Sequence, residues 1–95
     1  MRGLVWLDSA VNDLVRLRDF IRRENPNAAS RVASIIKETT QNLIHFPEIG
    51  KPVAELLDYR DLFIRFGAGG YIVRYRIQDE VIYMVHLRHY REERI

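Results

Sequence analysis

The sequence contains no cysteine and no long apolar segment. The lack of cysteine excludes a disulfide framework and a thiolate metal site, and it fits a reducing compartment. A membrane-spanning helix needs roughly 20 consecutive apolar residues, and the apolar runs here are much shorter. The start of the chain, residues 1–4, lacks the apolar stretch of a signal peptide. We therefore expect a cytoplasmic protein with no membrane contact.

The composition favours a globular domain with a mild excess of positive charge. The chain has 95 residues, of which 47% are hydrophobic and 29% are charged, so we expect a single domain spanning residues 1–95. The formal net charge is +2, which many proteins share. The local distribution is more informative. Arginines recur through residues 62–91, while the acids of that segment, Asp79 and Glu80, lie together in a predicted turn.

The first half of the sequence has helical periodicity. A short apolar strand is predicted at residues 3–7. Apolar residues then recur every three or four positions over residues 10–21, which predicts an amphipathic helix. The side chain of Asp8 or Ser9 is predicted to cap its first turn.

Pro26 ends this helix and separates it from a second one. Proline disfavours helical geometry in the preceding residue, and Asn27 is predicted to cap a helix that runs over about residues 28–44. The short linker makes the two helices an antiparallel hairpin. A loop with two prolines and a glycine follows at residues 46–52, and the structure of residues 53–58 is left open.

Strand periodicity dominates the last third of the chain. Apolar and polar residues alternate over residues 61–66, 71–77 and 81–88, and short turns separate the three segments. This pattern predicts an antiparallel meander with one apolar face against the helical hairpin. The predicted fold is therefore α+β: a short N-terminal strand, an antiparallel helical hairpin and an antiparallel three-strand meander, with the helices on one sheet face.

The opposite face of the predicted sheet is half apolar and half cationic. In the last strand, alternation predicts that Tyr83 faces the helices while Ile82 and Met84 face outward. A slip of one residue would bury arginine, which favours this register. The outward residues predicted to bind a partner are Phe63, Arg65, Ile72, Arg74, Arg76, Met84 and His86. Such a surface suits an anionic partner, either nucleic acid or an acidic protein segment.

The segment His89-Tyr90-Arg91 is a second candidate site. Imidazole can transfer protons near neutral pH, and arginine can stabilise the charge that develops on a reacting phosphate. Together with a tyrosine hydroxyl, these groups suit metal-free RNA cleavage, in which the 2′-hydroxyl attacks its own phosphate. The residues assigned to this activity are Arg65, Arg88, His89, Tyr90 and Arg91. The opposing interpretation is a charged chain end without a catalytic role.

Neither a metal site nor a cofactor site is predicted. His86 and His89 lie three positions apart, which on a strand directs them to opposite faces. His45 is remote from both, and no carboxylate pair has a recognisable ligand spacing. The glycines of residues 67–70 join two strands and do not open a helix, so they do not form a phosphate loop.

The order of these elements resembles the RelE/ParE superfamily of bacterial toxins from type II toxin–antitoxin systems. The segments that carry the resemblance are residues 10–21, 25–29, 46–52, 71–77 and 85–92. The resemblance implies a toxin that is neutralised by a cognate antitoxin, whose C-terminal segment wraps the toxin. It also implies that operator DNA is bound only through the antitoxin.

The superfamily has two branches, and two positions favour the ParE-like one. RelE-like members act at the ribosome as metal-independent endoribonucleases that cut mRNA, whereas ParE-like members inhibit DNA gyrase. Ile72 stands where those nucleases have an arginine, and no tyrosine follows Arg91, where they have their terminal catalytic one. The resemblance therefore implies gyrase inhibition first, a ribosome-dependent mRNA endonuclease second, and an inactive binding module third.

The antitoxin is expected to bind over the helical hairpin and the open edge of the sheet. It would cover the apolar side chains of Phe63, Ile72 and Met84. Acidic residues of the antitoxin would pair with Arg74 or Arg76, because opposite charges at an interface favour binding.

Overall fold

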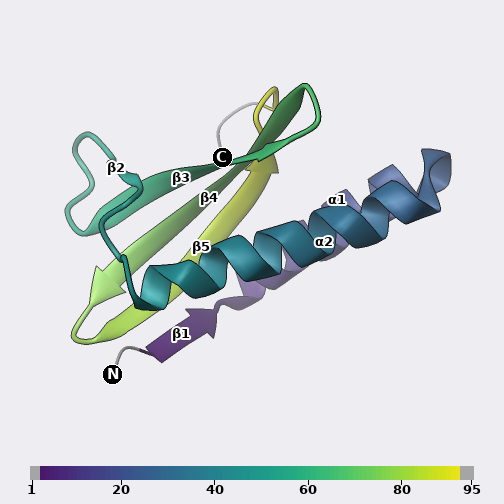
Figure 1. Ribbon diagram of the computed structural model, residues 1–95. Coiled ribbons are helices and arrows are strands. Elements are labelled where there is room, and N and C mark those ends of the chain that lie inside the picture. The colour runs from purple at the N-terminus through teal and green to yellow at the C-terminus, as the bar shows by residue number, and fades with distance from the viewer. Residues whose placement is uncertain (1–2, 93–95) are drawn as a thin grey trace.

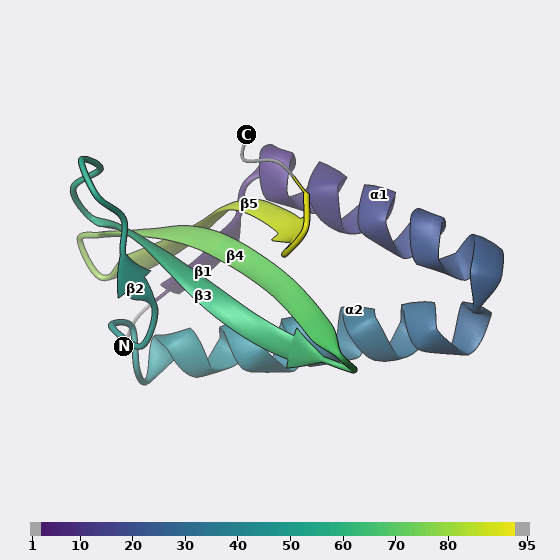
Figure 2. The ribbon, with the colours of Figure 1, turned by 90° about the horizontal axis from the view of Figure 1, so that it is seen from above.

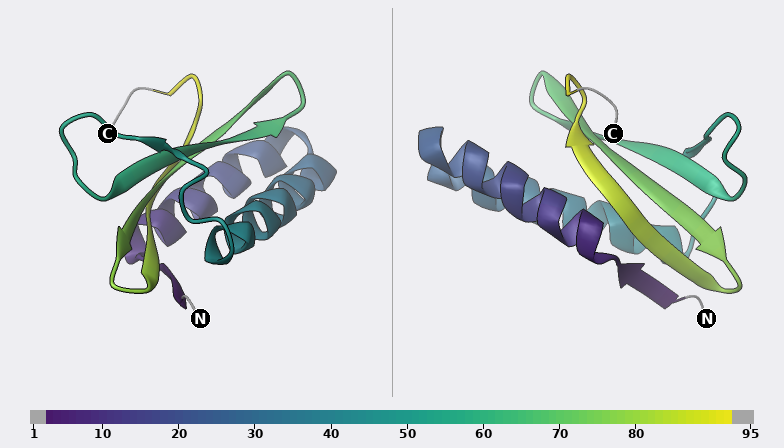
Figure 3. Two further views of the ribbon diagram at one scale, coloured as in Figure 1. Left: turned by 60° about the vertical axis from the view of Figure 1, so that its left-hand side comes forward. Right: turned by 180° about the vertical axis from the view of Figure 1, so that it is seen from behind.

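A five-stranded sheet and a helical hairpin make up the structure (Figure 1). The computed structural model describes residues 3–92. Its elements are β1 (Gly3–Trp6), α1 (Asp8–Glu24), α2 (Pro26–Gln41), the short 3-10 helix η1 (Asn42–Ile44), β2 (Lys51–Pro52), β3 (Tyr59–Phe66), β4 (Gly69–Gln78) and β5 (Val81–His89). The strand order is β1-β5-β4-β3-β2, and both helices lie on the same side of the sheet (Figure 3). The predicted α+β fold is confirmed.

The two helices do not use the predicted caps. Leu7 precedes α1 without a side-chain cap, and the hydroxyl of Ser9 donates instead to a carbonyl of β5. The cap of α2 is Asn25, whose side chain accepts from a backbone amide of the first turn. The proline that follows fits the first helical position, where an amide hydrogen has no intrahelical partner. The predictions of Asp8 or Ser9 and of Asn27 as caps were therefore wrong.

The predicted meander of β3, β4 and β5 is confirmed, and a further strand joins each of its edges. β1 pairs in parallel with β5, from Gly3 opposite Val81 to Trp6 opposite Met84. β2 pairs antiparallel with the start of β3. β2 lies inside the segment predicted as a loop. The sequence does not predict this strand because its two residues, Lys51–Pro52, are too few to show a period. Proline suits this place, since an edge strand can lack one amide donor.

A β-bulge at Val85 interrupts the alternation of β5. Tyr75 of β4 lies opposite Met84, and the preceding residue of β4, Arg74, lies opposite His86. Val85 is therefore the extra residue on β5. One inserted residue moves every residue on one side of it to the opposite sheet face.

The bulge reverses the predicted faces in the first half of β5. Ile82 and Met84 face the helices and are 0% exposed, whereas Tyr83 lies on the other face. The prediction that Ile82 and Met84 point outward was wrong. A side chain as buried as Met84 has no surface to offer to a partner.

The helix-covered face of the sheet forms the hydrophobic core. Its buried members are Ala10, Leu17, Val32, Ile36, Leu43, Leu62, Ile64, Tyr71, Val73, Tyr75, Ile82, Met84 and Leu87. The hydroxyl of Tyr75 donates to the carbonyl of Pro47 at 2.7 Å and accepts from the amide of Gly50 at 2.9 Å. A Cβ atom at Gly50 would lie 2.7 Å from that hydroxyl, so the loop before β2 requires glycine here.

The two edges of the sheet are covered to different extents. Beyond the end of β1, side chains of α1 bind the main-chain groups at the edge of β5. Ser9 donates to the carbonyl of Val85 at 2.6 Å, and Asp13 accepts from the amide of Leu87 at 2.9 Å. β2 lies beside only the start of β3 (Figure 2). Within residues 3–92, no strand pairs with this edge of β3 from Leu62 onward.

Candidate partner-binding face

The sheet face opposite the helices carries the cations predicted from the sequence. The strand register gives three cross-strand rows: Tyr59–Arg76–Tyr83, Asp61–Arg74–His86 and Phe63–Ile72–Arg88. Arg65 lies further along β3, opposite Gly70. We call the surface formed by these rows and Arg65 the outer face. The predicted placement of the cations on one face is confirmed, and their roles stay predictions.

Arg74 is already neutralised by a carboxylate on the neighbouring strand. Its Nε and Nη2 atoms lie 2.9 and 3.0 Å from the two carboxylate oxygens of Asp61, and the side chains are 19% and 22% exposed. The hydrogen bond to Asp61 raises the pKa of Arg74 above its ordinary value. A bidentate pair of this kind satisfies the guanidinium fork, so Arg74 has little charge to offer to a partner.

His86 is engaged by the first helix. Its Nδ1 atom lies 3.2 Å from a carboxylate oxygen of Asp13, the same oxygen that accepts from the amide of Leu87. The imidazole thus extends the contact between α1 and the edge of β5. The predicted binding role of His86 would require a partner that reaches this edge.

Arg76 has no such internal partner. Its guanidinium carbon lies 5.7 Å from the ring centre of Tyr59, and Tyr83 lies opposite it on the other neighbouring strand. The Nε atom is buried without a hydrogen-bond partner, and no salt bridge found among residues 3–92 involves Arg76. This row of the outer face therefore carries an uncompensated positive charge between two phenol rings.

The arginines predicted to be catalytic form hydrogen bonds within the turn after β5. Arg88 donates to the carbonyls of Glu92 at 3.0 Å and Tyr90 at 3.4 Å. Arg91 donates to the Tyr90 hydroxyl at 2.8 Å. One carboxylate oxygen of Glu92 lies 2.6 Å from Arg16 of α1, which ties the turn to the helical hairpin.

The residues predicted to cut RNA lie on two sides of the sheet. Arg65 and Arg88 belong to the outer face, whereas His89 pairs with Tyr71 on the helix-covered side, with ring centres 5.3 Å apart. The Nδ1 atom of His89 accepts from the amide of Arg91 at 3.2 Å. The sheet thus separates His89 from Arg65 and Arg88, whereas Tyr90 and Arg91 line one groove with His89.

Tyr90 packs over the glycines that open β4. A Cβ atom at Gly69 would clash with the Tyr90 ring, and Phe63 contacts the same ring edge-on, with centres 6.3 Å apart. Gly70 makes similar room for Phe63. The glycines, predicted only as a turn, therefore allow two aromatic rings to lie against the backbone beside Arg65.

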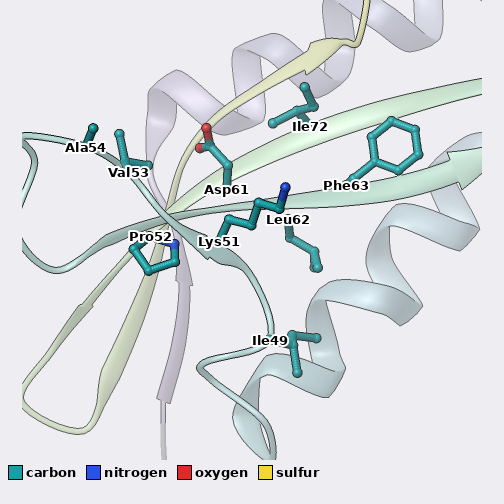
Figure 4. A pocket seen from close by; sticks show the side chains of 9 residues that line it. All are labelled: Ile49, Lys51, Pro52, Val53, Ala54, Asp61, Leu62, Phe63 and Ile72. Carbon is teal, nitrogen blue, oxygen red and sulfur yellow. The ribbon is translucent and has the colours of Figure 1, made fainter.

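Three grooves adjoin these residues, and one of them, of about 290 Å³, is lined by Gly69, His89, Tyr90 and Arg91 among others. The other two are larger. The first, of about 670 Å³, lies where the cover of β3 by β2 ends (Figure 4), and it is lined by Ile49, Lys51, Pro52, Val53, Ala54, Asp61, Leu62, Phe63 and Ile72. The second, of about 550 Å³, lies between α1 and the turn after β5. Its apolar wall includes Leu17, Ile21 and Phe20, which is 63% exposed. The sequence analysis missed the second groove, although Phe20 beside charged residues was a signal.

Two kinds of site are not found in the part of the chain that the structure describes. No cluster of three or more side chains suited to hold a metal ion occurs there. No helix there is long and apolar enough to cross a membrane.

Comparison with known proteins defines the class. A family model described as "ParE toxin of type II toxin-antitoxin system, parDE" matches residues 4–94. Toxin RelE2 of Caulobacter vibrioides is 33% identical over 89 residues, which cover 94% of this chain and 96% of that protein. Toxin RelE3 of the same organism is 29% identical over 85 residues, which cover 90% of each. A solved structure titled "Chromosomal ParDE TA system from P. aeruginosa" has the same fold, with a TM-score of 0.77 at 21% identity over 94% of this chain and 96% of that one.

The fold and these matches define a toxin of a type II toxin–antitoxin system. The chain belongs to the ParE toxin family, within the RelE/ParE superfamily. Membership implies a cognate antitoxin as partner.

Proposed function

We propose that this toxin inhibits DNA gyrase in the cytoplasm by binding it, without catalysing a reaction. The observation that carries the proposal is the separation of His89 from Arg65 and Arg88 by the sheet. Metal-free RNA cleavage needs an acid, a base and a charge-stabilising group around one phosphate. His89, Tyr90 and Arg91 line one small groove, but Arg65 and Arg88 lie on the opposite face of the sheet from His89.

The hydrogen bonds of the other candidate catalytic side chains, and the position of Ile72, support the same function. The hydroxyl of Tyr90 accepts from Arg91, and Arg88 is bound to main-chain carbonyls. Ile72 lies between Phe63 and Arg88 on the outer face, so an apolar side chain fills the centre of the row. Such a surface favours protein contact over phosphate binding.

A ribosome-dependent mRNA endonuclease is the second candidate. Three relatives carry the RelE name, and one part of the outer face suits RNA. Arg65 is exposed beside the Phe63–Tyr90 ring pair, and aromatic rings next to arginine are a common surface for stacking unpaired bases. An inactive binding module is the third candidate.

Induction of the toxin alone in a bacterial host separates the three functions. Gyrase inhibition predicts growth arrest, altered plasmid supercoiling and intact transcripts. Codon-position cuts in translated mRNA would contradict it and support the endonuclease, and unimpaired growth would support the inactive module. The variant Tyr90→Phe sharpens the test, because loss of this hydroxyl should abolish RNA cleavage but leave gyrase inhibition intact.

For the antitoxin, we propose binding across the groove at the open edge of β3. Phe63 and Ile72 supply apolar surface there, and the unpaired edge from Leu62 offers main-chain groups to an extended segment. Met84 is excluded because it is buried. Phe63→Asp and Ile72→Asp should each weaken the purified complex at least roughly tenfold. Unchanged affinity in a calorimetric titration would refute this placement.

A further inference from the structure

We propose that the loop at residues 53–58 and the neighbouring Arg76 form the surface that docks on the toxin's protein target. Leu57 enters an apolar pocket of that target, and Arg76 pairs with a carboxylate beside the pocket. This inference rests on the proposed function, since it requires a protein target.

Leu57 projects from a loop whose shape holds it outward. The side chain is 90% exposed, and that of Leu56 is 43% exposed. The loop is closed by main-chain hydrogen bonds: the amide of Val53 donates to the carbonyl of Tyr59 at 3.0 Å, and the amide of Tyr59 donates to the carbonyl of Leu56 at 3.3 Å. The leucine pair is therefore presented on a closed turn.

The backbone on both sides of the leucines adopts an unfavourable conformation. Glu55 and Asp58 have φ angles of 67° and 68°, in the left-handed region that side chains other than glycine rarely occupy. Such conformations persist where the surrounding structure fixes them, and they cluster at functional sites. Here they flank the two exposed leucines.

The loop and Arg76 are joined through the first residues of β3. The carbonyl of Asp58 accepts from the amide of Ile77 at 2.9 Å, and the ring of Tyr59 lies under the Arg76 guanidinium. Figure 3 shows the loop at the same end of the sheet as the β4–β5 turn, on the side away from the helices. The apolar projection and the uncompensated charge thus lie at the same end of the sheet.

The chemistry of this surface indicates a protein partner. An aliphatic side chain gains free energy by entering an apolar pocket, and a half-buried guanidinium without a carboxylate gains a charge-assisted hydrogen bond from an acidic side chain. RNA would satisfy Arg76 through its phosphates but would offer little to Leu57. The combination favours a protein pocket with a carboxylate at its rim.

The surface is distinct from the groove proposed for the antitoxin. That groove includes Val53 and Ala54 at the base of the loop, but neither Leu57 nor Arg76 lines it. This assignment replaces the expectation that antitoxin acids pair with Arg76, so substitutions at Leu57 and Arg76 should separate target binding from antitoxin binding.

The test compares purified wild-type toxin with Leu57→Asp and Arg76→Gln. Phe46→Ser, at a side chain 62% exposed on another loop, and Arg31→Gln, on the exposed side of α2, are the matched controls. Inhibition of supercoiling by purified DNA gyrase is measured for each. Leu57→Asp should raise the half-inhibitory concentration at least roughly tenfold, and Arg76→Gln should raise it severalfold. The controls should match wild type, as should antitoxin affinity and the thermal midpoint of every variant.

Three outcomes would overturn the inference. The first is a wild-type toxin that inhibits gyrase together with a Leu57→Asp variant that inhibits it equally. The second is a variant that loses antitoxin affinity while keeping full toxicity, which would assign the loop to the antitoxin. The third is a wild-type toxin that arrests growth by cutting mRNA, or does not act on gyrase at all. That result refutes the proposed function itself and is recognised because wild type already fails. Leu57→Ser serves as a milder replacement if Leu57→Asp does not fold.

Discussion

The two faces of the sheet are built from alternate residues of the same strands, yet their side chains are stabilised in different ways. On the helix-covered face, apolar groups exclude water, and the phenol of Tyr75 has partners for its hydroxyl. On the outer face, charge is satisfied unevenly: Arg74 is paired with Asp61 and Arg88 with main-chain carbonyls, whereas Arg76 has no salt bridge within residues 3–92. The difference teaches that alternation along a strand indicates which face a residue occupies, but not whether its charge is available to a partner.

The largest expected effect tests which residues of β5 belong to which face. Met84→Asp places a carboxylate among fully buried side chains and should destabilise the fold by more than about 4 kcal/mol. Tyr83→Asp, on the outer face, should change the free energy of unfolding by less than about 1 kcal/mol. Urea denaturation measures both. The reverse order of effects would show that Val85 is not the bulged residue.

A smaller effect is expected from the buried hydroxyl on the helix-covered face. Tyr75→Phe removes the partner of the Gly50 amide and the Pro47 carbonyl, and it should destabilise the fold by about 1–3 kcal/mol. Tyr71→Phe is the matched control, because the Tyr71 hydroxyl makes no hydrogen bond within residues 3–92. Loss of this hydroxyl should therefore have a smaller effect on stability. Equal losses of stability would contradict the bridging role of Tyr75.

On the outer face, the effect of one ion pair should be smaller again. A double-mutant cycle of Asp61→Asn and Arg74→Gln should give a coupling free energy of about 1 kcal/mol, because the pair is bidentate but still partly solvated. The same variants should leave toxicity unchanged if Arg74 is occupied within the toxin. A coupling energy near zero would mean that the pair does not persist in solution.

The smallest effect on stability is expected from alkaline pH. Burial raises the pKa of Tyr75 and that of Tyr71 above the ordinary value. The folded state therefore keeps these protons after the unfolded state has lost its own. The contribution of these two tyrosines to stability should be constant below about pH 10 and should fall as the pH rises above it. When the free energy of unfolding is measured against pH, it should fall less steeply for Tyr75→Phe than for wild type. An identical slope would contradict the assignment of this effect to Tyr75.

Much of the fold could be predicted from the sequence because long elements repeat their pattern many times. The two helices and three long strands each contain several periods of buried side chains. β2 is too short to contain one. The bulge escaped prediction because residues 81–85 are apolar or aromatic throughout, so either register buries apolar groups and no polar residue marks the extra position.

The candidate site could be predicted only in outline. Alternation placed Arg65, Arg74, Arg76 and Arg88 on one face, as the register confirms. Whether each guanidinium is occupied depends on cross-strand register and on the path of the chain after β5, which local patterns do not contain. The same holds for Asp13, whose carboxylate reaches β5 from a helix far away in the sequence.

The parallel pairing of β1 with β5 joins the two strands that lie furthest apart along residues 3–92. A nascent chain that stops before β5 lacks both the partner of β1 and the buried Ile82, Met84 and Leu87. Contacts so distant in sequence form late, because a long loop must close first. An active molecule therefore cannot exist before β5 has been synthesised, and products truncated before β5 should be inactive and readily degraded. The interval gives a previously made antitoxin time to meet the toxin as it folds.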